Sequence, residues 1–322
     1  MTLTPLPRFL QPLQPPGWRP ALPAPPAGGP AWALDLFASP ARSEAAQPVA
    51  AAIALPPPGH GQVAAAPGHP VASNAGLPAG HGFDGRIASQ TLAALTRAGG
   101  VSAAYVSPAN GQREVAVLAT PGFDPMRPYH VLVYARGIEG DNAKSLEGQF
   151  LTQTLRGLNE AGRNVLLVLP KSPTAMHAWF TGAESLGALV PEALDRFRAL
   201  TGLPLGEPAE RWLMAHSGGG KAVENALSRA DAPRLDRLLL ADSTYGTWAT
   251  GTLAALRRQP GIAVATVVTA HNAARAHAQL GRHGLRVDAM PAYPQPGHNG
   301  VPAYMLKEFL GVRPTRTFSA VP

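Results

Sequence analysis

The 322-residue sequence contains no cysteine, and this absence excludes several kinds of chemistry. Without thiols the chain has no disulfide, no thiolate nucleophile and no cysteine-ligated metal. Charged residues are also scarce, at 15% of the chain, although the basic ones outnumber the acidic ones and give a formal net charge of +7. The basic residues are scattered rather than gathered in a stripe, so we expect no nucleic-acid partner.

Long apolar runs are missing as well. No stretch approaches the ~18 residues that a membrane span needs, so we expect no membrane-spanning segment. Residues Met1–Pro16 carry prolines where a secretory signal has its apolar core. In the absence of such a signal the cytoplasm is the default compartment, and export by a non-classical route stays open.

Proline separates the first part of the chain from the rest. Eighteen of the 35 prolines lie in the first 80 residues, and only five acidic or basic side chains accompany them. Such a composition buries too little apolar surface to fold, and proline runs such as Pro56–Pro58 favour extended segments. We therefore predict a disordered Pro/Ala/Gly-rich leader over residues 1–84, whose partner is unknown, and a folded domain over residues 85–322.

After the leader the apolar pattern alternates between strands and helices. Asp84 is predicted to cap a helix that ends at Ala98. Asn110-Gly111 between two β-patterned runs predicts a hairpin, and later continuous apolar runs suit parallel strands buried on both faces. The predicted strands are 101–107, 112–120, 130–135, 164–169, 212–215, 237–241, 262–269 and 285–290. The predicted later helices are 145–161, 183–200, 219–230, 250–258, 273–282 and 301–310. This alternation predicts an α/β fold with a doubly wound, mostly parallel sheet of eight strands.

The stretch after the fifth predicted strand carries the strongest functional signal. Ala215-His216-Ser217-Gly218-Gly219 places a serine at a sharp strand-to-helix turn, where strained dihedral angles require small neighbours. The pattern resembles the G-x-S-x-G nucleophile elbow of the α/β-hydrolase superfamily, with alanine replacing the first glycine. The resemblance covers roughly residues 101–311 and implies a serine hydrolase, most simply an esterase, with Ser217 as its nucleophile.

A serine hydroxyl needs an imidazole to take its proton, and the imidazole needs a carboxylate to fix its tautomer. The superfamily orders these residues as serine, acid and histidine along the chain. His298 follows the last predicted strand, where the resemblance places the base. His216 is expected to pack or hydrogen-bond beneath the site, because neighbours in a sharp turn point their side chains apart. The other histidines after the serine are expected on the surface: His271, His277 and His283. A role in the site stays open for His271, which follows the carboxyl end of a strand, where α/β proteins build their sites.

Two aspartates compete for the third position. The superfamily most often places its acid after the seventh strand, but that strand ends here in Thr269 with no acid following. Asp242 ends the sixth strand, where a carboxylate is costly unless it is hydrogen-bonded or charge-paired. Asp242 is therefore the predicted acid, and Asp288, inside the eighth strand, is the second choice.

Backbone N–H groups are expected to bind the oxyanion. The resemblance implies that one is the N–H of the residue after the nucleophile, here Gly218, at the start of a helix whose dipole favours negative charge. The resemblance places the other in the loop after the third strand, at Arg136-Gly137, where Arg136 holds the loop or meets an anionic substrate group. Three aromatic residues are predicted to wall the substrate pocket: Trp179, Tyr245 and Trp248.

Other functions fit parts of the same pattern. Gly218–Lys221 is similar to a phosphate loop, but alanines stand at 215 and 222, where that motif needs glycine and a hydroxyl residue. A serine peptidase or amidase would use the same elbow, and a catalytically degenerate fold would serve as a binding module. We expect acyl-enzyme chemistry on a small-molecule or polymer ester, with no metal and no organic cofactor.

Overall fold

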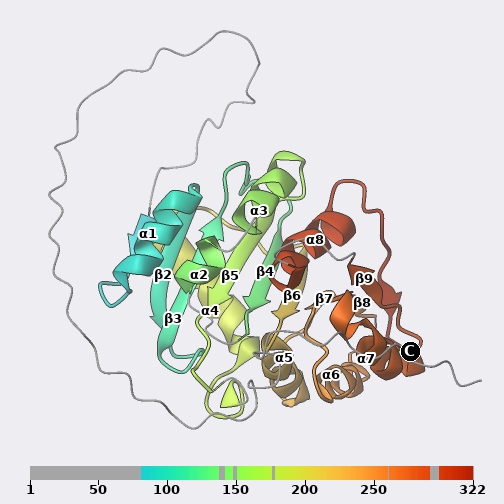
Figure 1. Cartoon of the computed structure of the whole chain (residues 1–322). Helices are drawn as coiled ribbons and strands as arrows, with labels where there is room; N and C mark the ends of the chain where they lie inside the picture. Colours follow the sequence, from blue (N-terminus) through green and yellow to red (C-terminus); the bar gives the residue numbers. More distant parts are fainter. Residues whose placement is uncertain are drawn as a thin grey trace, which may run out of the picture. The chain divides into compact units, whose positions relative to one another are not determined.

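The computed structural model describes residues 81–137, 142–147, 151–175, 178–259, 261–290 and 297–321. Within these ranges the chain forms a mixed, largely parallel sheet with helices on both faces (Figure 1). Residues 1–80 of the predicted leader lie outside the described residues. No helix in the described ranges combines the length and the apolar character that a membrane span requires.

The sheet in these ranges has ten strands rather than the eight predicted. Their bounds are β1 His81–Phe83, β2 Val101–Ser107, β3 Arg113–Ala119, β4 His130–Ala135, β5 Val165–Pro170, β6 Glu210–His216, β7 Arg237–Ala241, β8 Ala263–Thr269, β9 Asp288–Met290 and β10 Ser319–Ala320. The strand order is β1-β2-β3-β5-β4-β6-β7-β8-β10, and β9 also pairs with β8. The pairs β2–β3, β3–β5 and β8–β10 are antiparallel, and the other pairs are parallel.

The two additional strands lie at positions that carry no strand pattern. Strand β1, before the predicted boundary at residue 84, has three residues and pairs with β2. Strand β10 has two residues and pairs with β8. Segments this short have no period to detect, and only the backbone of the partner strand makes them part of the sheet.

Helices cover the two faces of the sheet and enclose two separate cores. Their bounds are α1 Ser89–Ala98, α2 Asn142–Glu147, α3 Leu151–Glu160, α4 Leu186–Thr201, α5 Gly219–Ser228, α6 Trp248–Leu256, α7 Ala270–Leu280 and α8 Gly297–Leu310. Helices α4, α5, α6 and α7 pack on one face, and α1, α2, α3 and α8 pack on the other. Alternate residues of β6 serve the two cores: Leu213 and Ala215 the first, Trp212 and Met214 the second.

Except for α5, the helices begin at other residues than predicted, and two of these differences change the place of a named residue. Helix α1 begins at Ser89, because Asp84 accepts hydrogen bonds from Arg86 instead of capping the helix. Helix α8 begins at Gly297 instead of residue 301, so His298 lies in its first turn and not in the preceding loop. The predicted helix 145–161 corresponds to α2 and α3, with residues 148–150 outside the described ranges.

Candidate active site

Ser217 lies in the sharp turn between β6 and α5. Its φ is +54°, in the left-handed region that strains any residue with a side chain. The Ser217 N–H donates to the carbonyl of Ala241, the last residue of β7, at 3.2 Å. This bond places the turn against the carboxyl end of the neighbouring strand, where α/β proteins build their sites.

The glycines after Ser217 allow α5 to start between two strand ends. A Cβ on Gly219 would lie 1.9 Å from the carbonyl oxygen of Ala135, and one on Gly220 would lie 2.4 Å from that of Ser243. Side chains at either position would therefore push the helix off the sheet. The rival phosphate-loop lysine, Lys221, is engaged elsewhere, since its Nζ pairs with Glu224 at 2.7 Å.

His298 and Asp242 meet although 56 positions separate them. The His298 Nδ1 lies 2.7 Å from the Asp242 Oδ2. An ionised carboxylate only accepts hydrogen bonds, so Nδ1 carries the hydrogen, and in the neutral imidazole Nε2 keeps its lone pair. Asp242 is 1% exposed and His298 is 38% exposed. Asp242 thus holds the His298 ring from its buried side, and another side of the ring is open to solvent.

Neutral groups surround the Asp242 carboxylate. Thr269, at the end of β8, donates its N–H to Oδ1 at 3.2 Å and its hydroxyl to Oδ2 at 3.1 Å. Asn272, in the first turn of α7, donates to Oδ1 at 2.9 Å. Burial by itself would raise the pKa of Asp242, but hydrogen bonds from His298 and Asn272 outweigh burial and hold the pKa below its usual value. The acid is therefore ionised at neutral pH.

Asp288, the second-choice acid, is held by arginines. Its Oδ1 lies 3.0 Å from the Arg286 Nε and 3.3 Å from the Arg316 Nη1. The structure therefore brings Asp242 to His298 and gives Asp288 cationic partners.

The loop after β4 lies directly against the elbow. A Cβ on Gly137 would come within 2.5 Å of the Gly218 nitrogen and 2.8 Å of the Ser217 Cβ. Only glycine permits this approach of the backbone to the serine. The adjacent Arg136 has a buried Nη1 with no hydrogen-bond partner among the described residues. Residues 138–141, which continue the loop, lie outside those residues.

His216 hydrogen-bonds beneath the site, as predicted. It is 4% exposed, and its Nδ1 lies 3.1 Å from the Tyr134 hydroxyl. Its Nε2 lies 3.1 Å from the main-chain oxygen of His298. Burial, with the nearby charges of His298 and Arg136 in addition, lowers the pKa of His216 to about 3. The ring is therefore neutral at the pH values at which most enzymes work.

The three predicted pocket aromatics have different surroundings. Tyr245 packs edge-on against Trp248, with ring centroids 5.7 Å apart. Burial, followed by the charge of Asp242, raises the pKa of Tyr245 to about 12. Hydrogen bonding with the Asn272 and Ser217 side chains lowers this pKa, but by less. Tyr245 therefore lies beside the serine. Trp179 has no exposed surface and belongs to the hydrophobic core, where its Nε1 donates to Asn110 at 3.0 Å.

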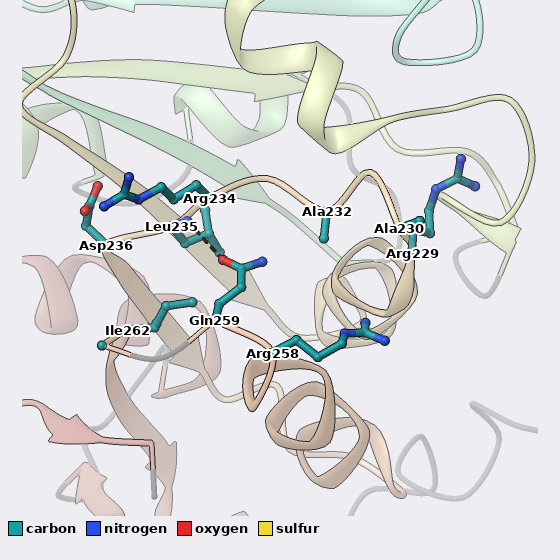
Figure 2. Close-up of a pocket in the computed structure, with 10 residues that line it drawn as sticks. Arg229, Ala230, Ala232, Arg234, Leu235, Asp236, Arg258, Gln259 and Ile262 are labelled. Atoms are coloured by element: carbon teal, nitrogen blue, oxygen red, sulfur yellow. Dashed lines mark hydrogen bonds between the residues drawn. The ribbon is translucent and has the colours of Figure 1, made fainter.

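A surface hollow of about 840 Å³ lies away from these residues, at the starts of β7 and β8 (Figure 2). Because parallel strands run in the same direction, this edge of the sheet is opposite to Ser217 and Asp242. Two of the arginines that line it are already engaged: Arg229 pairs with Asp231, and Arg258 donates to the carbonyl of Leu227. In the described ranges no group of three or more histidines and acids is placed to hold a metal ion.

Comparisons with known proteins find similar solved structures, and the three named here are at most 18% identical to this chain. No family model and no curated protein matches the chain. Similar solved structures include LpqC, a poly(3-hydroxybutyrate) depolymerase from Bordetella parapertussis, at 15% identity over 68% of this chain and 94% of that chain, with a TM-score of 0.40. The feruloyl esterase module from Clostridium thermocellum matches at 13% identity over 64% and 84%, with a TM-score of 0.41. An IroE-like serine hydrolase from Shewanella oneidensis matches at 18% identity over 63% and 77%, with a TM-score of 0.38.

These distant likenesses do not bear on what the chain does. The arrangement of its own residues is α/β-hydrolase-like: a largely parallel sheet, a strained serine after the fifth predicted strand, and an aspartate and a histidine that follow it in that order. Of the three histidines predicted on the surface, His271 and His277 are exposed on α7, and His283, just after that helix, is half-buried.

Proposed function

We propose that the protein is a serine hydrolase that cleaves carboxylic esters through an acyl-enzyme, with Ser217, His298 and Asp242 as its triad. The observation that carries the proposal is the 2.7 Å hydrogen bond between His298 and the buried Asp242. This pair lies at the end of the strand whose last carbonyl holds the N–H of Ser217. A degenerate fold that serves only for binding has no need of such convergence.

In the first half of the reaction, the Ser217 Oγ attacks the ester carbonyl carbon while its proton passes to the His298 Nε2. The ionised Asp242 accepts the Nδ1–H of His298 and stabilises the imidazolium that forms. The bond from the carbonyl carbon to the alcohol oxygen then breaks, and His298 returns the proton to the departing alkoxide. An alcohol leaves, and the acyl group stays on Ser217.

In the second half, water takes the place of the alcohol. His298 removes a proton from the water as its oxygen attacks the acyl carbon. The bond to the Ser217 Oγ breaks, and the serine recovers a proton from His298. The products are one alcohol and one carboxylic acid, and the enzyme returns to its starting state with no cofactor.

The negative oxygen that forms in both halves needs donors that are already in place. The proposed donors are the N–H of Gly218 and an N–H of the Arg136–Gly137 loop. Two observations support them. The Gly218 nitrogen lies at the start of α5, where the helix dipole favours negative charge. A Cβ on Gly137 would reach both that nitrogen and the serine, so the two backbones are in contact.

Tyr245 and Trp248 are the proposed walls of the substrate pocket. The support is stronger for Tyr245, because the Ser217 side chain lies close enough to its hydroxyl to affect its pKa by hydrogen bonding. An aromatic wall next to the nucleophile favours an ester with an apolar acyl or alcohol group. The core position of Trp179 leaves it without such a role.

A fluorophosphonate probe tests the nucleophile. We expect rapid labelling of the wild type and no labelling of Ser217→Ala. The matched control is Ser243→Ala, a buried serine of the same sheet edge, which should label like the wild type. Hydrolysis of a p-nitrophenyl ester and of the anilide with the same acyl group compares esters with amides. Equal labelling of wild type and Ser217→Ala would refute the proposal.

A further inference from the structure

The main-chain carbonyl of His298 is free to bind a group outside its own helix. In an α-helix a carbonyl accepts from the N–H four residues later. For His298 that residue is Pro302, which has no N–H to donate. The His216 Nε2 lies 3.1 Å from this oxygen. A side chain of β6 therefore occupies the position that the helix leaves vacant.

The hydrogen-bond directions around His216 follow from its partners. A carbonyl oxygen only accepts, so the His216 Nε2 carries the hydrogen. The Nδ1 of the neutral ring is then an acceptor and receives the Tyr134 hydroxyl at 3.1 Å. Burial raises the pKa of Tyr134, so this hydroxyl keeps its proton. The bonds run in one direction, from Tyr134 through His216 to His298.

His298 is thereby held at two points. Its carbonyl receives His216 from β6, and its Nδ1 donates to Asp242 after β7. The two histidine rings lie 4.6 Å apart with a tilt of 33°. Because His216 directly precedes Ser217, it ties the strand that carries the proposed nucleophile to the helix that carries the proposed base.

The charged and titratable groups around His216 come from three elements. Tyr134 and Arg136 lie in and after β4, Asp242 follows β7, and His298 belongs to α8. In the proposed reaction His298 becomes positive, and a positive His216 at 4.6 Å would oppose that change. A neutral His216 with both nitrogens bonded supports His298 without this repulsion.

We propose that His216 is a positioning residue, which holds the base His298 toward Ser217 through the carbonyl that Pro302 leaves free. This inference rests on the proposed serine hydrolase function. It assigns His216 no contact with the substrate. It also gives Pro302 a part in the site, since an N–H at that position would compete for the same carbonyl.

Two amides that differ by one methylene test the inference. In His216→Gln the side-chain NH₂ reaches about as far as the histidine Nε2, and in His216→Asn it reaches only as far as Nδ1. We expect Gln to stay within about 5-fold of the wild-type kcat, and Asn to lose about 10- to 100-fold in kcat with little change in KM, because a base displaced by about 1 Å costs that much. Equal activities of the two variants would overturn the proposal.

Restoring the helical donor gives an independent measurement. Pro302→Ala supplies an N–H that competes with His216 for the His298 carbonyl, so it should lower kcat by about 3-fold or more in the wild type and cause no further loss in His216→Asn, where that donor is already absent. An equal loss in both backgrounds would contradict the inference. Wild type that neither labels with fluorophosphonate nor cleaves an ester would instead refute the proposed function, so the two failures are distinguishable.

Discussion

Asp242 and Asp288 are both buried aspartates near the carboxyl side of the sheet, yet their surroundings differ in kind. Asp242 receives hydrogen bonds from Thr269, Asn272 and His298. Asp288 lies between the guanidinium groups of Arg286 and Arg316. Both arrangements satisfy a carboxylate that would otherwise be costly to bury.

The difference lies in whether the carboxylate charge is neutralised by its partners. Arginines cancel the charge of Asp288, which then serves as an ion pair that holds β9 and the C-terminal segment. Neutral donors stabilise the charge of Asp242 without cancelling it, so the full negative charge remains for the imidazole. His216 extends the same principle to His298, the proposed base, because it too acts as a neutral donor.

Exchanging each carboxylate for an amide is the strongest test of this comparison. We expect Asp242→Asn to lower kcat by about 10³- to 10⁴-fold, because the amide no longer fixes the tautomer of His298. Asp288→Asn should keep activity within about 3-fold and affect mainly stability. Ester hydrolysis by both variants measures the effect. A large loss in Asp288→Asn with none in Asp242→Asn would reverse the roles of the two acids.

Removing one neutral donor should have an intermediate effect. Asn272→Ala takes one hydrogen bond from the Asp242 carboxylate, and we expect kcat/KM to fall by about 10-fold, the worth of one bond to a charged group. The control is His277→Ala, an exposed histidine on the same helix, which should match the wild type. Identical activities of Asn272→Ala and the control would mean that this donor does not support the acid.

The neutrality of His216 predicts a dependence of stability on pH. Its pKa is about 3 in the folded protein, against the ordinary 6.5, so the unfolded chain binds a proton that the folded chain does not. This contribution to stability is complete above about pH 6.5 and is lost as the pH falls toward 3, at about 1.4 kcal/mol per unit. Denaturant unfolding of wild type and His216→Gln between pH 7 and 5 measures it. Equal slopes would contradict a buried neutral ring.

The arginine partners of Asp288 should give the smallest effect. Both are partly exposed, so solvent screens their pairing, and we expect Arg286→Ala to lower the free energy of unfolding by about 1 kcal/mol or less. Activity should be unchanged, because neither arginine contacts the proposed triad. Denaturant titration and ester hydrolysis of the same preparation provide both values. A loss of activity without loss of stability would contradict the assignment of Asp288 and its arginines to stability alone.

Much of the fold was predictable because its signals are local. The apolar patterns of strands and amphipathic helices can be recognised within about ten residues. Each of the eight predicted strands is present in the structure. The elbow is local as well, since a short stretch holds the strand end, the serine and the glycines that Ala135 and Ser243 require. The core of the sheet and the turn that carries Ser217 were therefore predictable from short stretches of sequence.

Features that depend on partners distant in the sequence follow from packing alone. Strands β1 and β10 exist through pairing with β2 and β8, and no pattern of their own marks them. The choice of Asp242 as the partner of His298 joins positions 56 residues apart, and the link from His216 to His298 joins positions 82 apart. The sequence around a residue does not predict which distant hydrogen-bond donor will lie against it in the folded protein. Composition and spacing made Ser217 recognisable, and only packing decided which groups surround it.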